Sequence, residues 1–268
     1  MLHGTGMVTQ YHGLGSPSRQ KRASRRRNEM NFAIRREVGF STYQQDLKGL
    51  AGAPIELALP YKLEEYLRDR GNLGPLAALV RQAGISCPSV HAPQGRLTDD
   101  GFLSWALEAV RFAENIGAGV VVFHPESVRK DERTNMQILA LRHLRELQRD
   151  TGLRIAVETF GSHKRVLLPE EIGEKGLWMV LDTSHVFEDR TRELVEHYHD
   201  RIAAVHLSEM RADETGEVRP HLPVQGFGFE VLGMLRAKAW NGTVTLEYLL
   251  EYHDRLLSDR EALEALFS

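Results

Sequence analysis

The sequence has little that would tie the chain to a membrane or to an oxidising compartment. It contains a single cysteine, Cys87, so an internal disulfide bond is excluded and a reducing cytoplasm suits the chain. No run of apolar residues approaches the roughly 18 that a membrane-spanning helix needs. The sequence therefore predicts a cytoplasmic protein without a membrane segment.

A dinucleotide-binding fingerprint is also missing. No G-x-G-x-x-G follows the first predicted strand, which disfavours a doubly wound nucleotide-binding sheet. The formal net charge is only −3 over 268 residues, with 42% hydrophobic and 26% charged residues, so the chain can bury a substantial core. This length is normal for a single α/β barrel of about 250 residues.

The first 30 residues differ in composition from the rest of the chain. Residues 1–30 hold six Lys and Arg residues against one acid and show no apolar periodicity. They also lack the apolar stretch of a secretory signal peptide. We interpret them as a disordered basic extension, with Met30 as an alternative start, in preference to a nucleic-acid-binding arm. The remainder holds 28 basic and 36 acidic residues, which disfavours a broad nucleic-acid-binding face.

Short apolar segments of strand type recur along the remainder of the chain. Continuous, β-branched runs of this kind are typical of parallel strands that are covered on both sides. The predicted strands lie within residues 37–43, 53–61, 87–93, 118–125, 153–160, 177–185, 202–209 and 242–249. Amphipathic helices are predicted within residues 101–118, 134–152, 191–202, 229–242 and 260–267.

This alternation of strand and helix predicts the α/β fold class, as a (β/α)₈ TIM barrel that forms one domain over residues 31–268. An open, doubly wound sheet is the alternative. In such barrels the functional site lies where the strands end, because the loops that follow the strands converge there.

Potential metal ligands stand at or just beyond the ends of six consecutive predicted strands. These residues are His91, His124, Glu158, Asp182, His185, His206 and Glu247. A single histidine at a strand end is more often a hydrogen-bonded structural residue. Clustered carboxylates repel one another and lose hydration, however, so a barrel mouth lined with them needs a compensating cation. The pattern therefore predicts a divalent metal site.

The types of ligand limit the choice of metal. Carboxylate and imidazole groups without thiolate suit Mn²⁺, Zn²⁺, Co²⁺, Fe²⁺ or Mg²⁺. Asp182 and His185 are three residues apart, so on a straight strand they would face opposite sides. We expect both to face the mouth because the strand turns into its loop between them.

The segments VHAP, FHP, VETF, LDTSH, VHLSE and TLEY, in this order, resemble the xylose isomerase-like TIM barrel superfamily. That superfamily includes sugar-phosphate isomerases and epimerases as well as endonuclease IV, an AP endonuclease of family 2. The resemblance extends from about Val38 to Glu251. The order of the segments is specific for the superfamily and much less specific for the reaction.

The epimerase branch implies one metal ion held by four residues. They would be Glu158, Asp182, His206 and Glu247. The resemblance further implies that Glu158 and Glu247 act as the catalytic acid and base on opposite faces of the substrate, and that His185 contacts substrate. A cation that bridges a carbonyl and a neighbouring hydroxyl acidifies the C–H bond between them, which a flanking carboxylate can then deprotonate.

The endonuclease IV branch implies three zinc ions. His91 and His124 match its ligands on the third and fourth strands, and His221 matches one ligand of the third ion. Arg219 stands where that branch has an aspartate, and an arginine there could instead hold an anionic group of the substrate. The loop QGRLTDD offers no apolar wedge for opening a duplex, which further disfavours DNA as the substrate.

The roles of His91 and His124 stay open among substrate binding, a second metal and structure. The predicted function is a divalent-metal-dependent isomerase or epimerase of a small carbohydrate-type substrate, such as a sugar or sugar phosphate. The alternatives are a zinc-dependent phosphodiesterase of the endonuclease IV type and a non-catalytic barrel that binds a metal or metabolite. The oligomeric state is open, although related barrels often form homo-oligomers.

Overall fold

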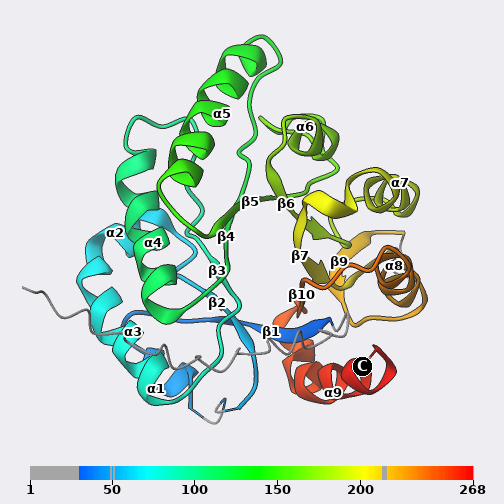
Figure 1. Cartoon of the computed structure of the whole chain (residues 1–268), viewed down its shortest axis with the longest axis horizontal. Coiled ribbons are helices and arrows are strands. Elements are labelled where there is room, and N and C mark those ends of the chain that lie inside the picture. The colour runs from blue at the N-terminus through cyan, green and yellow to red at the C-terminus, as the bar shows by residue number, and fades with distance from the viewer. Residues whose placement is uncertain (1–29, 49, 51, 213–215, 268) are drawn as a thin grey trace, which may run out of the picture.

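The computed structural model describes residues 30–48, 50, 52–212 and 216–267. Within them, eight parallel strands close into a barrel in the order β1-β10-β7-β6-β5-β4-β3-β2 (Figure 1). The barrel strands are β1 (Asn31–Glu37), β2 (Ile55–Ala58), β3 (Ser89–His91), β4 (Val120–Phe123), β5 (Arg154–Glu158), β6 (Trp178–Asp182), β7 (Ile202–Leu207) and β10 (Thr243–Leu246). The predicted TIM barrel is confirmed, and the open sheet is excluded because β1 pairs with both β2 and β10.

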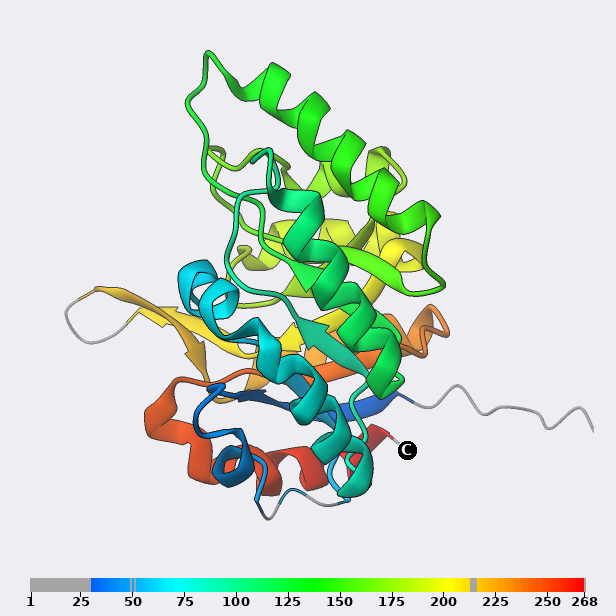
Figure 2. The same ribbon diagram turned by 90° about the vertical axis from the view of Figure 1, so that its left-hand side faces the viewer.

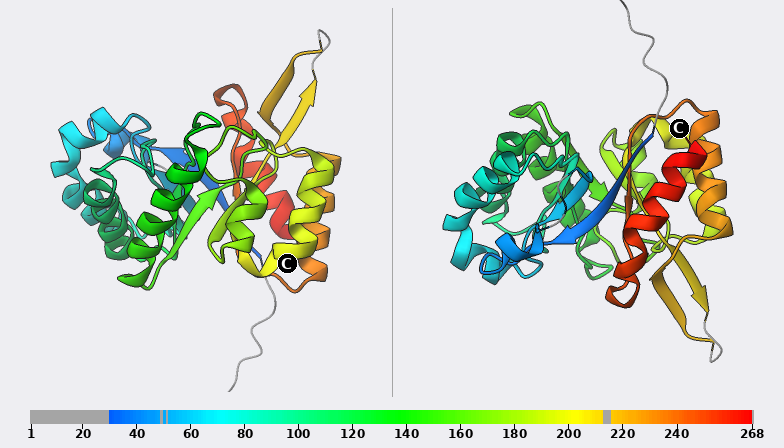
Figure 3. Two further views of the ribbon diagram at one scale, coloured as in Figure 1. Left: turned by 90° about the horizontal axis from the view of Figure 1, so that it is seen from above. Right: turned by 90° about the horizontal axis from the view of Figure 1, so that it is seen from below.

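Helices surround the barrel on its outside. They are α1 (Tyr43–Asp46), α2 (Leu63–Asp69), α3 (Leu73–Gln82), α4 (Phe102–Ile116), α5 (Arg133–Arg149), α6 (Pro169–Glu174), α7 (Glu188–Tyr198), α8 (Gly226–Ala237) and α9 (Leu256–Phe267), with short 3₁₀ helices η1 (Arg70–Asn72), η2 (His199–Arg201) and η3 (Leu250–Arg255). In Figure 3, α9 runs alongside β1, and the rings of Phe32 and Phe267 lie 6.3 Å apart. The last helix thus covers the first strand.

Alternation along the strands separates two apolar clusters. Residues that point outward, such as Val121 and Val157, join the large core between the barrel and its helices. Inward-pointing residues such as Val122 and Ala204 form a small second cluster inside the barrel. Val122 pairs in register with His91, and Ala204 pairs with Val180. The small apolar side chains therefore fill the barrel interior and leave the strand ends to polar groups.

The first predicted strand, residues 37–43, is wrong. The structure places β1 earlier, at Asn31–Glu37, and residues 43–46 form α1 instead. More than half of β1 is charged or polar, and Arg35 pairs with Glu247 rather than joining the apolar core. This charge hid the strand from a search for apolar runs. The other strand positions are confirmed.

A two-stranded antiparallel hairpin interrupts the alternation after β7. It consists of β8 (Glu209–Ala212) and β9 (Val218–Leu222), and the sequence analysis treated this region as a plain loop. Figure 2 shows the hairpin projecting from the body on the same side as the long connection between β4 and α5. Both excursions follow strand ends and therefore flank the mouth of the barrel.

The predicted basic extension lies outside the described residues, except for Met30, which is buried in the large core between the barrel and its helices. No helix in the described part of the chain is both long and apolar enough to cross a membrane.

Cys87 offers a simple test of the packing. The thiol is buried just before β3, and burial raises its pKa to about 12. Because the thiolate is the reactive form, we expect native protein at about pH 8 to show no reaction with a thiol-specific chromogenic disulfide. One thiol per chain should react after denaturation. Rapid labelling of the native protein would contradict the packing around β3.

Candidate metal centre

Six neighbouring strands deliver a potential metal ligand to the same end of the barrel. His91, Glu158 and Asp182 are the last residues of β3, β5 and β6, and His206 lies near the end of β7. His124 and Glu247 directly follow β4 and β10. Because parallel strands of a closed barrel end on one face, these side chains converge although they lie far apart in the chain.

The ligand-type side chains form three overlapping groups within the described residues. In each group, one nitrogen or carboxylate oxygen per residue lies within 4.8 Å of the others. The groups are Glu158–Asp182–His206–Glu247, His91–His124–Glu158 and Asp182–His185–His221. We call them the central, histidine and loop groups, respectively. Glu158 belongs to the first two and Asp182 to the first and third, so each of these carboxylates joins two potential cation positions.

His206 is the hub of the central group. Its Nδ1 lies 3.1 Å from Glu158 Oε1, 3.0 Å from Glu247 Oε2 and 4.0 Å from Asp182 Oδ2. All four side chains are buried or nearly so, with Asp182 and His206 inaccessible to solvent. Carboxylate oxygens packed this closely need a positive charge among them.

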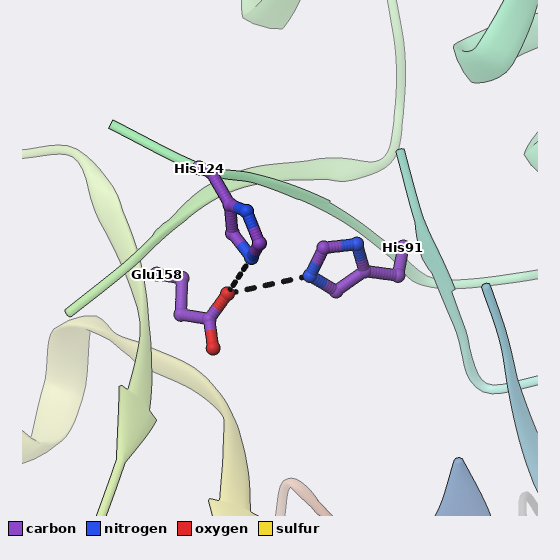
Figure 4. A group of neighbouring side chains, drawn as sticks. All are labelled: His91, His124 and Glu158. Carbon is purple, nitrogen blue, oxygen red and sulfur yellow. Dashed lines mark hydrogen bonds and ion pairs between the residues drawn. The ribbon is translucent and has the colours of Figure 1, made fainter. Parts of the chain in front are cut away.

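Glu158 turns its two oxygens toward different groups. While Oε1 faces His206, Oε2 lies 3.3 Å from His91 Nε2 and contacts His124 Nε2 (Figure 4). The rings of His91 and His124 stand edge-to-face with their centroids 4.6 Å apart. The structure thus brings both histidines against a residue of the central group.

The loop group depends on a turn after β6. Asp182 Oδ1 accepts hydrogen bonds from the backbone N–H groups of Ser184 and His185, at 2.7 and 3.1 Å. These bonds hold the chain in a turn that brings His185 back toward the mouth, with its Nε2 3.9 Å from Asp182 Oδ2. His221 stands edge-on to His185 at 4.8 Å, and its φ of 57° is uncommon for a residue other than glycine. The expectation that Asp182 and His185 face the same mouth is therefore met.

Two charged residues of the site escaped the sequence analysis. Glu56 on β2 is fully buried; its carboxylate lies 3.0 Å from His206 Nε2 and accepts a 2.7 Å hydrogen bond from Ser89 Oγ. Arg35 on β1 forms an ion pair with Glu247. The signal was present: Glu56 is the lone charge in the apolar run PIELAL, and Arg35 follows the apolar FAI of β1. Neither residue ends its strand, so a search of strand ends missed both.

Charge interactions within the site are strong. Burial opposes a charged His206, but Glu56, Glu247 and Glu158 outweigh it and hold the His206 pKa well above its ordinary value. Burial likewise opposes ionisation of Glu158, yet His124 and His206 hold the Glu158 pKa well below its usual range. The site therefore attracts positive charge, which a divalent cation can supply in place of protons.

The donor set fits a divalent cation. Asp182 Oδ2 is buried and accepts no hydrogen bond from any residue that the structure describes. Glu247 Oε2 is buried as well and meets His206 Nδ1 at 3.0 Å without hydrogen-bond geometry. Burial raises the pKa of Asp182, and Glu158 adds to the shift, so this carboxylate lacks a full counter-charge. Imidazole and carboxylate donors without thiolate suit Mn²⁺, Co²⁺, Zn²⁺ or Mg²⁺, as the sequence indicated.

Arg219 does not join these groups. It lies on β9, its side chain is half-exposed, and its Nη2 is 2.9 Å from Glu251 Oε1. The neighbouring His221 does reach the mouth, with Ser184 Oγ and Ser208 Oγ at 3.2 and 3.4 Å from its Nδ1. The hairpin thus places one of the two residues in the site and the other on its outer surface.

Comparison with known proteins agrees with the barrel fold. The sequence profile described as "Xylose isomerase-like TIM barrel" matches residues 73–267. The chain belongs to this family. None of the curated proteins matches the sequence significantly.

Solved structures show the same fold at low sequence identity. A D-tagatose 3-epimerase-like protein has a TM-score of 0.65 and 18% identity, covering 88% of this chain and 96% of that chain. The 3-keto-D-glucoside 4-epimerase of E. coli has a TM-score of 0.62 and 14% identity, over 89% and 99%. Endonuclease IV from Thermus thermophilus has a TM-score of 0.58 and 18% identity, over 88% and 99%. At such identities the likeness concerns the fold alone.

Replacement of Glu56 tests the electrostatic support of His206. In Glu56→Gln the amide has one oxygen and no charge with which to face His206 Nε2 and Ser89 Oγ. We expect Co²⁺ or Zn²⁺ affinity to fall by about 10- to 100-fold in competition with a chromogenic chelator. Glu261→Gln, on the exposed surface of α9, is the matched control and should bind like the unaltered protein. Equal metal affinity of the unaltered protein and both variants would show that Glu56 does not support metal binding.

Proposed function

We propose that the protein is a divalent-metal-dependent isomerase or epimerase that acts on a small sugar or sugar phosphate. The observation that carries this proposal is the central group, in which Glu158 and Glu247 approach the same nitrogen of His206 from β5 and β10. β6 and β7 lie between these two strands in the barrel, so the two carboxylates reach the centre from different sides.

Glu158, Asp182, His206 and Glu247 would hold the cation. When bound, a divalent cation polarises a substrate carbonyl and acidifies the adjacent C–H bond. Glu158 and Glu247 each have a second oxygen directed away from His206, toward His124 and Arg35 respectively. One of the two, as the carboxylate, would remove the proton from the substrate carbon, and the other, in its protonated form, would give its proton to the opposite face.

Aromatic side chains around the mouth support a carbohydrate-type substrate. Phe160 stacks on His185 at 4.4 Å and stands edge-on to His124 at 5.4 Å. Tyr61, which is 48% exposed, stands edge-on to His124 as well. The exposed Tyr61 ring offers apolar surface to the C–H face of a sugar, whereas His185 and Arg165 already lie against the Phe160 ring. His185 would donate or accept a hydrogen bond with a hydroxyl group of the sugar. Two structural neighbours are named as an epimerase or epimerase-like protein, which agrees with this proposal.

A second candidate function, phosphodiester hydrolysis with several zinc ions, is favoured by the histidine and loop groups. Each shares a carboxylate with the central group and could hold a further cation next to it. Adjacent cations can stabilise both the attacking and the leaving oxygen of a phosphodiester. A barrel that binds metal or metabolite without turnover is the remaining alternative.

Metal content separates the two catalytic candidates first. Protein purified without chelator is expected to carry one exchangeable divalent metal ion per chain, which Mn²⁺ or Co²⁺ can replace. Elemental analysis measures this directly. Several tightly held zinc ions, lost in a His91→Ala and His124→Ala double variant, would favour phosphodiester hydrolysis instead. His197→Ala, a substitution on α7 outside the three groups, is the control.

Proton exchange tests the chemistry. With metal-loaded protein in deuterium oxide, we expect a panel of ketoses and ketose phosphates to include a substrate that gains deuterium next to its carbonyl, as seen by NMR. Glu158→Gln should lower this exchange by about 10²- to 10⁴-fold, because the positioned base is lost. Glu188→Gln, on the exposed surface of α7, should leave it unchanged. Cleavage of abasic DNA without any sugar exchange would overturn the proposal.

A further inference from the structure

The loops that follow β4 and β5 are joined into a short ribbon at the barrel mouth. Ser127 and Arg165 form an antiparallel bridge. Val128 N donates to Lys164 O at 2.8 Å, and Val166 N donates to Glu126 O at 2.9 Å. The ribbon begins within a few residues of His124 and Glu158, so it extends directly from the histidine group.

The adjacent residues Lys164 and Arg165 have different surroundings. Lys164 lines an outer cavity of about 870 Å³ together with Lys130 and Arg129. The guanidinium of Arg165 instead lies over the ring of Phe160, 4.1 Å from its centroid. Phe160 in turn stacks on His185. Arg165 therefore stands on the side of the ribbon that faces the candidate metal centre.

Arg165 is held in place without a carboxylate. Its Nη1 donates a 2.8 Å hydrogen bond to Pro125 O, and Phe160 fixes the plane of the guanidinium. No carboxylate of the described residues lies within 4.0 Å of it, and its buried Nε has no hydrogen-bond partner among them. Arg35, Arg133 and Arg219, by contrast, each form an ion pair with a glutamate.

Such an arginine is suited to recognising an oxyanion. The guanidinium offers several N–H donors in a fixed plane, a geometry that matches phosphate and carboxylate groups. Glu158 and Glu126 interact with Arg165 electrostatically without pairing with it. Glu126 is already engaged, since it accepts hydrogen bonds from the backbone N–H groups of Leu97 and Thr98.

We propose that Arg165 binds an oxyanionic group of the substrate, a phosphate or a carboxylate, beside the metal centre. That the oxyanion belongs to a substrate rests on the proposed function, whereas the binding of an oxyanion by Arg165 does not. An anion-holding role was one possibility for Arg219 from the sequence; we place it instead on a different loop, because Glu251 already pairs with Arg219. Arg165 would determine specificity and take no part in the proton transfer.

The test uses three variants that each remove one positive charge. Inorganic phosphate and acetate are titrated separately, by calorimetry, into the full-length metal-loaded protein and into Arg165→Met, Lys164→Met and Arg219→Met. Lys164→Met is the matched control, since it removes the charge of the adjacent residue, which lines the outer cavity. Any contact of the anion with the metal is common to all four proteins, so differences among them report on the side chain that was changed.

Arg165→Met is expected to weaken the binding of one of the two anions by about tenfold or more. The anion affinities of the other two variants should stay within about twofold of that of the unaltered protein. The anion affected distinguishes phosphate from carboxylate. Equal losses in all three variants would indicate a general charge effect and overturn the proposal. So would a larger loss in Lys164→Met, no loss in Arg165→Met, or no binding of either anion to the unaltered protein.

Two further measurements check that the variants fold and bind metal normally. Arg165→Lys keeps the charge without the planar group and should show an intermediate loss, which keeps the proposal testable if Arg165→Met fails to fold. Metal content is measured for every protein and should not change. Absence of isomerase activity would contradict the proposed function, but the anion titration could still be interpreted. The two proposals can therefore be rejected independently of each other.

Discussion

The site depends on the burial of one imidazole among carboxylates. His206 lies on the barrel interior with Glu56 at one ring nitrogen and Glu158 and Glu247 at the other. Neither the imidazole nor these acids would be stable there alone, because each charge has lost its hydration. Their mutual attraction fixes the orientation of the ring, and with it the direction of Nδ1 toward the central group. The other two groups are attached to this arrangement through Glu158 and Asp182.

A carboxylate shared between two groups couples them. Glu158 uses one oxygen for His206 and the other for His91 and His124, so a change at one oxygen alters the charge that the other presents. Proton transfer with one cation, which we propose, and hydrolysis with several, the second candidate, would both use this set of side chains. This ambiguity is physical, since both kinds of chemistry need carboxylates and imidazoles around a cation in a buried mouth.

Much of the fold and site could be predicted from the sequence, and the main exceptions share a cause. The apolar strands and their polar ends were recognisable because parallel strands are covered on both faces and deliver their last residues to one rim. β1 was misplaced and Glu56 and Arg35 were missed because they carry charge within a strand, where only the tertiary structure supplies partners. The position of Arg219 outside the mouth depends on the pairing of β8 with β9 and on the contact with Glu251, neither of which the local sequence reveals.

The β8–β9 hairpin contributes to the site from outside the barrel strands. Most ligand-type residues stand on barrel strands or just beyond them, but His221 comes from β9, and its carbonyl oxygen accepts a backbone hydrogen bond from Leu249 N, shortly after β10. Lengthening, shortening or replacing this excursion would change the loop group and leave the strands intact. Evolution, or a protein engineer, could therefore exchange one cation position or substrate contact without rebuilding the barrel.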